Sequence, residues 1–514
     1  MPKTSSEAII RRNRQLVSDC EPAAAFAFFT DIAAIPRESG NMQAIADYLA
    51  GFARERSLEC FRDNLSNIVI RKPAQRSQAK DGVILQAHQD MVCVKAEGAA
   101  HDFANDPIEF TRPAPDILAA NGTTLGADDG IGIAIALAVL DNQEIAHPPL
   151  EALFTIDEET DMKGAKAITA DMLQGKHLIN IDAEELGLAY VSSAAGYGMR
   201  VDIPIKRANN RSGWSDYREI RVDGLSGGHS GAQINAGFAN AFVLLARMLA
   251  DAEKTIDCGL ITFDLGGDAG ADNAIPGKAA ATVALSSSGD ADKLDALVAE
   301  WNETFKREYR ASDPGVQLSS RPLTAEAVQL PPLTAESGKT FLDFIRLMPL
   351  GVFRFVQDKR LLDDVLYKDL LVETSCNLGI ARLEKDKAHF RPLARGSVKS
   401  VLDDLAGRIE DLSRMAGGDF TIRNRTAGWE MAAEKPEVQR LFEDSSVLKW
   451  QLIGVHAGLE CGCLVETFEK AGRELHAVSA GPTILNPHSP QELLEINTVH
   501  PMWDSLLEVL ARLA

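Results

Sequence analysis

The sequence has few cysteines for its length, and they do not form a disulfide pattern. Its 514 residues include seven cysteines, an odd number, scattered from Cys20 to Cys463. A disulfide framework needs paired cysteines, so we expect free thiols and a reducing, cytoplasmic compartment. Cys461 and Cys463 could form a metal or redox pair, but without a matching second pair they are more typical of buried thiols.

The sequence also lacks long apolar runs. No stretch approaches the roughly 20 apolar residues of a membrane-spanning helix. Residues 1–20 are polar and charged, without the apolar centre of an export signal. We therefore expect neither membrane insertion nor export.

Positive charge is in short supply. The chain has 53 Lys and Arg residues against 74 Asp and Glu residues, which gives a formal net charge of −21 at pH 7. Nucleic acid binding requires a basic surface that neutralises phosphate, so this balance argues against it. Negative charge favours solubility, and near a site it would attract cations or the ammonium group of a small substrate.

Three buried strands are predicted to end in polar side chains. The segments 82–88, 150–159 and 177–182 are each an apolar run that ends in histidine or in acids. Open α/β sheets bind ligands outside the carboxyl ends of their strands. We therefore expect the polar ends of these three strands to share one crevice.

These strand ends carry His88, the pair Glu158-Glu159, and Asp182. Each has a simpler explanation when taken alone, because a histidine at a strand end is usually structural and adjacent acids usually lie on a solvated surface. Here the acids follow a buried run, which weakens that explanation. Successive strand residues point to opposite sides, so Glu158 and Glu159 could serve two tasks, one binding metal and one facing water.

Asp128 lies in a different kind of element. It lies between Gly126 and Gly130, which bracket a tight turn, and it precedes an Ala-rich run that begins at Ile131 and is typical of a buried helix. Aspartate is a preferred helix N-cap, so capping alone explains this position. Beside the other acids and histidines, a carboxylate that bridges two metal ions becomes the favoured interpretation.

Together with Asp90 and His488, these residues complete a ligand set for two divalent metal ions and a general base. Imidazoles and carboxylates are the ligands that zinc, manganese and cobalt take from proteins. A two-metal hydrolase is therefore the leading interpretation. The full set is His88, Asp90, Asp128, Glu158, Glu159, Asp182 and His488.

With this set in place, the chain resembles the metallopeptidase family of aminoacyl-histidine dipeptidases, also called cytosolic non-specific dipeptidases or peptidase D, in the M20 clan of aminoacylases and carboxypeptidases. Two positions depart from the family pattern, Gln89 and Asp129, and neither is a ligand position. Asp129 adds negative charge beside the metals. The matching segments run through the chain in the family's order: 85–92, 101–103, 122–132, 157–159, 180–185, 227–231, 273–276, 456–462, 481–484 and 487–490.

The resemblance implies a role for each member of the set. One metal ion would be bound by His88 and Asp182, the other by Glu159 and His488, and Asp128 would bridge them. The ions are expected to be zinc, with cobalt or manganese as alternatives. Glu158 would be the general base that takes a proton from the attacking water. Asp90 would orient the imidazole of His88.

The resemblance also implies how a dipeptide would be held. His229, in a glycine-rich turn that composition alone would explain, would donate to the oxyanion of the tetrahedral intermediate. Arg395 would pair with the substrate carboxylate, for which its forked donors are suited, and Asn273 would help to hold the substrate. The backbone of Gly462 is a further candidate for that carboxylate. The family further implies a homodimer.

The length of the chain predicts at least two domains. We expect an α/β fold with a di-metal aminopeptidase-like catalytic domain, whose central mixed sheet is flanked by helices, and an inserted α/β lid domain. The catalytic domain would comprise residues 1–194 and 428–514, because His488 must reach the other ligands. The lid would comprise residues 195–427 and could contain two similar halves. Residues 192–198 are expected to form the connector.

Two alternatives stay open beside a dipeptidase of Xaa-His, β-alanyl-histidine and other unblocked dipeptides. The same metal core could remove the acyl group of N-acyl amino acids, or could act as a carboxypeptidase. The chain could also be a metal-binding protein without turnover, although a binder needs neither the base Glu158 nor the donor His229.

Overall fold

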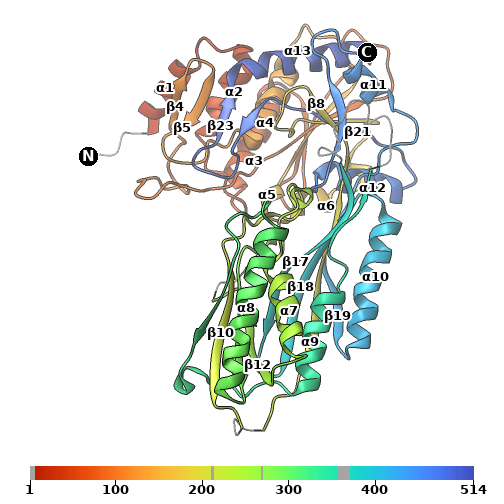
Figure 1. The fold of residues 1–514 in the computed structure, drawn as a ribbon. Coiled ribbons are helices and arrows are strands. Elements are labelled where there is room, and N and C mark those ends of the chain that lie inside the picture. The colour runs from red at the N-terminus through yellow and green to blue at the C-terminus, as the bar shows by residue number, and fades with distance from the viewer. Residues whose placement is uncertain (1–5, 210–212, 268–269, 357–370) are drawn as a thin grey trace. The chain divides into compact units, whose positions relative to one another are not determined.

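The structure is a computed structural model that describes residues 6–209, 213–267, 270–356 and 371–514 (Figure 1). The chain divides into two compact units. The first unit contains the residues up to Ser193, together with Trp429–Gly454 and Leu459–Ala514. The second unit contains Ala194–Gly428 and Val455–Gly458. The expected boundaries, 194/195 and 427/428, differ from these by one residue each, and the segment 455–458 was expected in the catalytic domain.

The expected connector at residues 192–198 is extended instead. Strand β8 (Leu188–Ser193) is followed, after the single residue Ala194, by β9 (Ala195–Pro204). Gly428 packs closely against the start of β9, because a Cβ added to it would lie 2.5 Å from the backbone nitrogen of Ala195. The small residues of this region therefore serve close packing rather than a loose turn.

The first unit contains an eight-stranded mixed sheet. Strand β3 pairs in parallel with both β6 and β7, and β7 pairs in parallel with β21. The three predicted buried strands are therefore confirmed, and their carboxyl ends meet at one edge of the sheet. In sheet order the strands are β1 (Glu59–Arg62), β2 (Ile68–Lys72), β6 (Leu150–Thr155), β3 (Val83–His88), β7 (His177–Asn180), β21 (His476–Ser479), β8 and β20 (Gln451–Val455).

Helices pack against this sheet. Helix α4 has buried residues from Ala127 to Leu140 on all its sides, because it contacts both α2 and the strands β3 and β6. Helix α12 packs Leu464 and Phe468 into a cluster with Ile84 and Leu153 of the sheet. The helices are α1 (Ser6–Leu16), α2 (Ala23–Ala33), α3 (Gln43–Glu55), α4 (Ala127–Asp141), α5 (Glu158–Asp161), α6 (Lys163–Ala167), α11 (Glu437–Glu443), α12 (Glu460–Lys470) and α13 (Ile496–Arg512).

Two predicted helices near the carboxyl terminus are present. Helix α11 follows Pro436 as expected. Helix α13 was expected to begin at Pro501 but begins at Ile496, so the proline lies inside it. A second, four-stranded sheet of this unit pairs β22 (Ile484–Leu485), β23 (Leu493–Glu495), β5 (Ile117–Ala120) and β4 (Phe110–Ala114).

The second unit contains two sheets whose strands and helices follow a similar order. Its four-stranded sheet has the order β12-β14-β10-β15, and its five-stranded sheet has the order β16-β17-β18-β9-β19. The elements of the first are β10 (Asp216–Asp223), α7 (Ala241–Ala252), β12 (Cys258–Asp264), β14 (Ala279–Leu285), α8 (Ser288–Glu308) and β15 (Gln317–Pro322). Those of the second are β9, α9 (Ala335–Leu347), β16 (Gly351–Phe355), β17 (Val372–Leu383), β18 (Lys387–Gly396), α10 (Lys399–Met415) and β19 (Asp419–Thr426).

Each half has a strand, a helix, two paired strands, a helix and a last strand, and the second half adds β16 at its edge. The four-stranded half is inserted in sequence between β9 and α9 of the other half. One core joins them, because Phe263 of β12 lies against Phe341 of α9 with ring centres 4.9 Å apart, and Phe341 stacks on Phe390 of β18 at 5.4 Å. The prediction of strand 279–285 and of a helix near 290–307 is confirmed.

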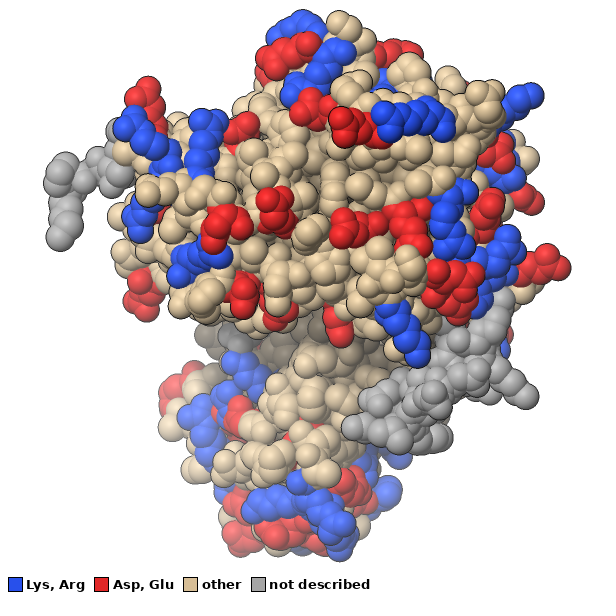
Figure 2. Space-filling model, turned by 90° about the horizontal axis from the view of Figure 1, so that it is seen from above, with Lys and Arg blue, Asp and Glu red and all other residues tan. Residues whose placement is uncertain are grey.

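None of the helices in the described part of the chain has the length and apolar character needed to cross a bilayer. All seven cysteines lie in described segments and none forms a disulfide, and Cys461 and Cys463 are buried in α12. On the face seen in Figure 2, acidic and basic side chains are interspersed over the surface.

Candidate metal centre and active site

The first unit brings the predicted ligands to one edge of its large sheet. His88 is the last residue of β3, and Asp182 lies two residues beyond the end of β7. Glu158 and Glu159 were expected at the end of a strand but begin the short helix α5. Asp157 before them turns the chain with a left-handed φ of 53°, and its carboxylate accepts a hydrogen bond of 2.6 Å from the backbone N–H of Gly40.

Asp128 lies at the centre of this group. Its Oδ1 is 2.9 Å from Nε2 of His88, and its Oδ2 is 3.1 Å from Nε2 of His488. The two oxygens of one carboxylate thus face two different imidazoles. Asp182 Oδ1 is 3.5 Å from Nε2 of His88, and Glu159 Oε2 is 2.9 Å from Nε2 of His488. The group therefore divides into two halves that share Asp128.

The two imidazoles differ in exposure. The His88 side chain is 1% exposed, whereas that of His488 is 52% exposed. His488 also has a left-handed φ of 59°, a conformation that a non-glycine residue adopts only when its surroundings favour it. The imidazole of His88 is therefore enclosed by protein, whereas that of His488 is open to solvent.

Glu492 fixes the turn that carries Asp128, although no motif marks this residue in the sequence. Its buried carboxylate accepts hydrogen bonds from the backbone N–H groups of Leu125 (2.7 Å), Ala127 (2.8 Å), Gly126 (3.0 Å) and Asp128 (3.3 Å). Helix α4 was expected after Asp128. It begins at Ala127, with non-helical backbone at Asp128 and Asp129, so Asp128 does not act as a simple N-cap.

Arg37 is a second unexpected member of the site. Its guanidinium is 2% exposed and donates to the carbonyls of Gln89 (3.0 Å), Asp90 (2.6 Å) and Gly126. It therefore ties the end of β3 to the turn before α4. A lone arginine in a polar segment carries no motif that would mark it in the sequence.

Asp90 connects the two glutamates to the end of β3. Its carboxylate accepts hydrogen bonds from the N–H groups of Glu158 (3.1 Å) and Glu159 (3.3 Å) and from the Ser39 hydroxyl (2.8 Å). His88 Nδ1 lies 3.1 Å from the carbonyl of Asp90 and 3.5 Å from its carboxylate. Burial would raise the pKa of Asp90, but His88 and Ser39 outweigh it and lower the pKa to about 2.

The carboxylates make this site strongly favourable for positive charge. Burial lowers the pKa of His88, but Asp182 and Asp128 more than reverse this effect and raise it. Hydrogen bonds to Asp128 and Glu159 raise the pKa of His488 to about 11. Burial raises the pKa of Asp182 to about 6 and raises the pKa of Glu158 well above its usual range. A divalent cation would supply the positive charge that these groups otherwise take up as protons.

The donor set fits divalent metal ions. One nitrogen or oxygen from each of His88, Asp128 and Glu159 lies within 4.8 Å of the others, and the same holds for His88, Asp129 and Asp182. Glu159 Oε1 is buried and has no hydrogen-bond partner among the described residues, as expected for an oxygen that would bind a cation. The carboxylate of Asp129 accepts hydrogen bonds from the backbone N–H groups of His88 and Gly132, at 3.2 Å each.

A buried polar network lies next to this group. Glu460 of α12 accepts hydrogen bonds from Gln86 (2.6 Å) and Thr155 (2.7 Å), and Gln86 accepts one from Asn180 (2.6 Å). Burial raises the pKa of Glu460 to about 7. The network links β3, β6 and β7 immediately before their polar ends.

The second unit assembles a separate cluster. His229 lies on β11 (Gly228–His229), which pairs with β13 (Ala274–Ile275), and the carbonyl of Asn273 accepts the N–H of Ser230 at 2.8 Å. A Cβ added to Gly231 would lie 3.1 Å from both the His229 ring and Nε of Arg395, and 2.7 Å from the carbonyl of His456. His229, Asn273 and Arg395, three of the four predicted substrate residues, therefore belong to this unit.

His456 joins this cluster, although the sequence did not single it out as a site residue. Its Nε2 lies 2.7 Å from the Ser375 hydroxyl. Burial and the nearby Arg395 lower the pKa of His456 to about 3. Burial and Arg395 lower the pKa of His229 as well. Both imidazoles are therefore neutral near pH 7.

Gly462, the fourth predicted substrate residue, belongs to the first unit. It is buried in the first turn of α12, where its N–H donates to the carbonyl of Leu459 at 3.0 Å. Because this N–H is already used, the geometry does not favour Gly462 as a donor to a substrate carboxylate.

Comparison with known proteins decides the family. The chain is 35% identical over 505 residues to the cytosol non-specific dipeptidase of Escherichia coli K12, covering 96% of this chain and 98% of that protein. The chain belongs to this dipeptidase family. Its structure resembles the crystal structure of an aminoacylhistidine dipeptidase from Vibrio alginolyticus, with a TM-score of 0.83, 34% identity, and coverage of 96% and 98%.

The fold extends to more distant peptidases. An aminopeptidase from Bacillus cereus has a TM-score of 0.56 at 14% identity, covering 96% of this chain and 99% of its own. No family model matches the chain. The predicted fold class, a central mixed sheet with helices and an inserted α/β unit, is confirmed, and the chain is a metallopeptidase.

Proposed function

We propose that this protein is a dipeptidase that hydrolyses unblocked dipeptides, including Xaa-His and β-alanyl-histidine, with two divalent metal ions. One observation carries the proposal: the two oxygens of Asp128 face His88 and His488, which places one carboxylate between two sets of metal ligands. Membership of the dipeptidase family supports the choice of substrate.

In the proposed mechanism His88 and Asp182 would hold one ion, Glu159 and His488 would hold the other, and Asp128 would contribute an oxygen to each. When bound, the ions polarise the scissile carbonyl and lower the pKa of the attacking water. Glu158 accepts the proton of that water and delivers it to the leaving amine. Burial raises the pKa of Glu158, and this suits a group that must take up and release a proton near neutrality.

Asp90 positions the base. Its carboxylate holds the N–H groups of Glu158 and Glu159 and lies beside Nδ1 of His88. A single side chain thus orients His88 and Glu159, which would each hold one ion, together with the proposed base Glu158. This role extends the predicted one, in which Asp90 acted on His88 alone.

The cluster of the second unit is proposed to bind substrate. Arg395 would pair with the terminal carboxylate of the dipeptide, because its side chain is half-buried and its buried Nε has no hydrogen-bond partner among the described residues. His229 would donate to the oxyanion, and Asn273 would support the β11–β13 pair on which His229 lies.

We further propose zinc as the metal, a cytoplasmic location and a homodimer. Two imidazoles and three carboxylates suit zinc, and they also accept cobalt or manganese. The name of the bacterial relative, a cytosol dipeptidase, supports the location.

The proposal is tested by measuring amino acid release from carnosine and a panel of α-dipeptides, each beside its N-acetylated counterpart. The zinc-loaded protein is expected to cleave only the peptides with a free amine, and a chelator should abolish that activity. Cleavage of the acetylated compounds instead would assign the protein as an acylase or carboxypeptidase. Absence of all cleavage by fully loaded protein would assign a metal-binding protein without turnover.

A further inference from the structure

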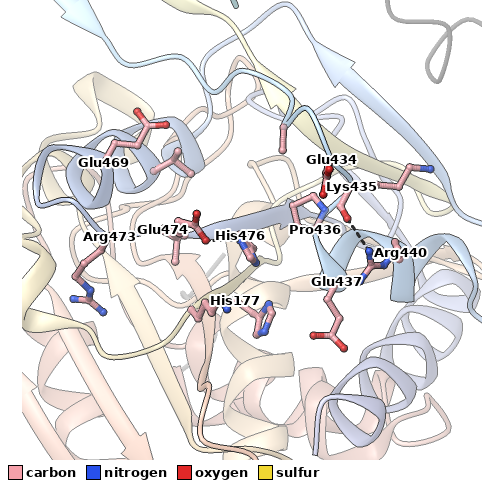
Figure 3. A pocket seen from close by; sticks show the side chains of 14 residues that line it. His177, Glu434, Lys435, Pro436, Glu437, Arg440, Glu469, Arg473, Glu474 and His476 are labelled. Atoms are coloured by element: carbon pink, nitrogen blue, oxygen red, sulfur yellow. Dashed lines mark hydrogen bonds and ion pairs between the residues drawn. The ribbon is translucent and has the colours of Figure 1, made fainter.

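A second pocket of the first unit lies at the opposite end of strand β7 from the candidate metal centre. It has a volume of about 570 Å³ and is lined by residues that include His177 and His476 (Figure 3). His177 begins β7, whereas Asp182 lies beyond the end of that strand. Five residues of extended chain span roughly 16 Å, so the pocket is separate from the ligands of the centre.

The sheet places the two histidines side by side. They occupy paired positions on the parallel strands β7 and β21, so their side chains project from the same face. Their ring centres are 5.6 Å apart, and the rings are inclined by 56°. Two imidazoles that share one tetrahedral zinc have ring centres roughly 5–6 Å apart, from a Zn–N distance of about 2.0–2.1 Å.

Both rings have nitrogen atoms that form no hydrogen bond with a described residue. His177 is 3% exposed, and within the described part of the chain neither of its ring nitrogens has a hydrogen-bond partner. The Nδ1 atom of His476 is likewise buried without a partner, and its Nε2 lies 3.5 Å from the Glu474 carboxylate. No hydrogen bond to a described residue holds either ring in place, so Nε2 of each ring remains available to a ligand.

The charges around the pocket favour a cation over an anion. Among its basic residues, Lys435 is paired with Glu443 at 2.6 Å, and Arg473 donates to the carbonyls of Ala170 and Leu173. Within the described chain, the carboxylates of Glu434, Glu437 and Glu469 have no ion pair of this kind. Of the other two basic residues of the lining, Lys176 pairs with Asp81 at 3.3 Å, and Arg440 donates to the carbonyl of Lys435 at 3.3 Å. All four basic groups therefore have a partner, whereas these three carboxylates have no ion pair within the described chain.

Burial and the neighbouring His476 lower the pKa of His177, which keeps its imidazole neutral near pH 7. A neutral imidazole is the form that binds metal. The Glu474 side chain is 82% exposed, so it is free to turn towards both rings.

We propose that His177 and His476, together with the carboxylate of Glu474, form a further binding site for a divalent transition-metal ion such as zinc or nickel. Imidazole nitrogens select these ions over magnesium or calcium. The site does not depend on the proposed function, because no residue of the candidate metal centre contributes to it.

The test counts zinc in the holoenzyme. Wild type and the double variant His177→Gln/His476→Gln are equilibrated with excess Zn2+, desalted, and measured by mass spectrometry of the metal. We expect the double variant to hold one ion fewer per chain. The matched control is His500→Gln, since His500 is an exposed histidine of α13 that lies 3.5 Å from Asp504, and it should retain the wild-type count.

A second measurement keeps the test decisive if the double variant fails to fold. The single variant His476→Gln changes a partly exposed side chain, and it should also lose one ion while it keeps the wild-type circular dichroism spectrum. In electron paramagnetic resonance, Cu2+ added to the wild type should show hyperfine splitting from imidazole nitrogen. This splitting should be reduced in His476→Gln. Equal zinc counts in wild type and His476→Gln would overturn the proposal. Because peptidase activity is not the readout, failure of the proposed function leaves the test unaffected.

Discussion

At the scale of single residues, two adjacent glutamates have different surroundings. Both N–H groups are held by Asp90, but the side chain of Glu159 lies 2.9 Å from His488, whereas no hydrogen bond joins the Glu158 carboxylate to a described residue. This difference supports the proposed roles, Glu159 as a metal ligand and Glu158 as the base. The sequence predicted both tasks, although the strand geometry behind that prediction was wrong because α5 begins at Glu158.

The first prediction at this scale concerns the base. Replacing Glu158 by Gln keeps its shape but removes its ability to accept a proton, so kcat should fall by roughly 100- to 10,000-fold. Zinc content, measured on the same sample, should stay at the wild-type value. The matched control is Glu185→Gln, at an exposed glutamate three residues after Asp182, and this variant should keep its activity. If Glu158→Gln retained most of its activity, another group would be the base.

At the scale of elements, the turn before α4 shows why the bridging position is so closely defined. Glu492 holds four successive N–H groups of this turn, and Arg37 holds its Gly126 carbonyl. Gly132 allows the start of the helix to approach the sheet, because a Cβ there would lie 2.5 Å from the carbonyl of Ile181. The glycine pattern was visible in the sequence, but the two charged side chains that fix the turn come from distant segments.

Changing Glu492 to Gln tests this support. The variant keeps the size of the side chain but weakens its hold on the N–H groups of residues 125–128, so Asp128 should be less firmly placed. We expect a 10- to 100-fold loss of zinc affinity, as is usual for residues that orient metal ligands. Competition with a chromophoric chelator measures this affinity. Glu495→Gln, at the start of α13, is the control, and an equal loss there would point to a general loss of stability.

At the scale of the whole molecule, the proposed metal ligands come from five separate segments of the first unit and none from the second. His88, Asp128, Glu159, Asp182 and His488 are joined by the pairing of β3 with β6 and β7 and by the return of the chain after Gly428. A metal bound by segments so far apart in sequence stabilises the fold that assembles them.

Metal removal should therefore destabilise the first unit more than the second. At metal concentrations of about 100 times Kd, each ion stabilises the folded first unit by about 2.7 kcal/mol. We expect chelation to increase hydrogen exchange in residues 125–130 and 484–492, measured by mass spectrometry. Helix α7 of the second unit, residues 241–252, should exchange at an unchanged rate and serves as the internal control. Equal deprotection of both regions would contradict this assignment.

The sequence by itself determined the buried strands, the polar residues at their ends and the group of acids and histidines, because apolar periodicity and residue chemistry are local properties. His88, Asp128 and Asp182 were identified in this way. Only the tertiary structure decided that Arg37 and Glu492 support the site, that Gly462 has its N–H occupied, and that His177 meets His476 across two strands. These contacts join segments up to several hundred residues apart, and their positions depend on strand register and packing, which no local pattern encodes.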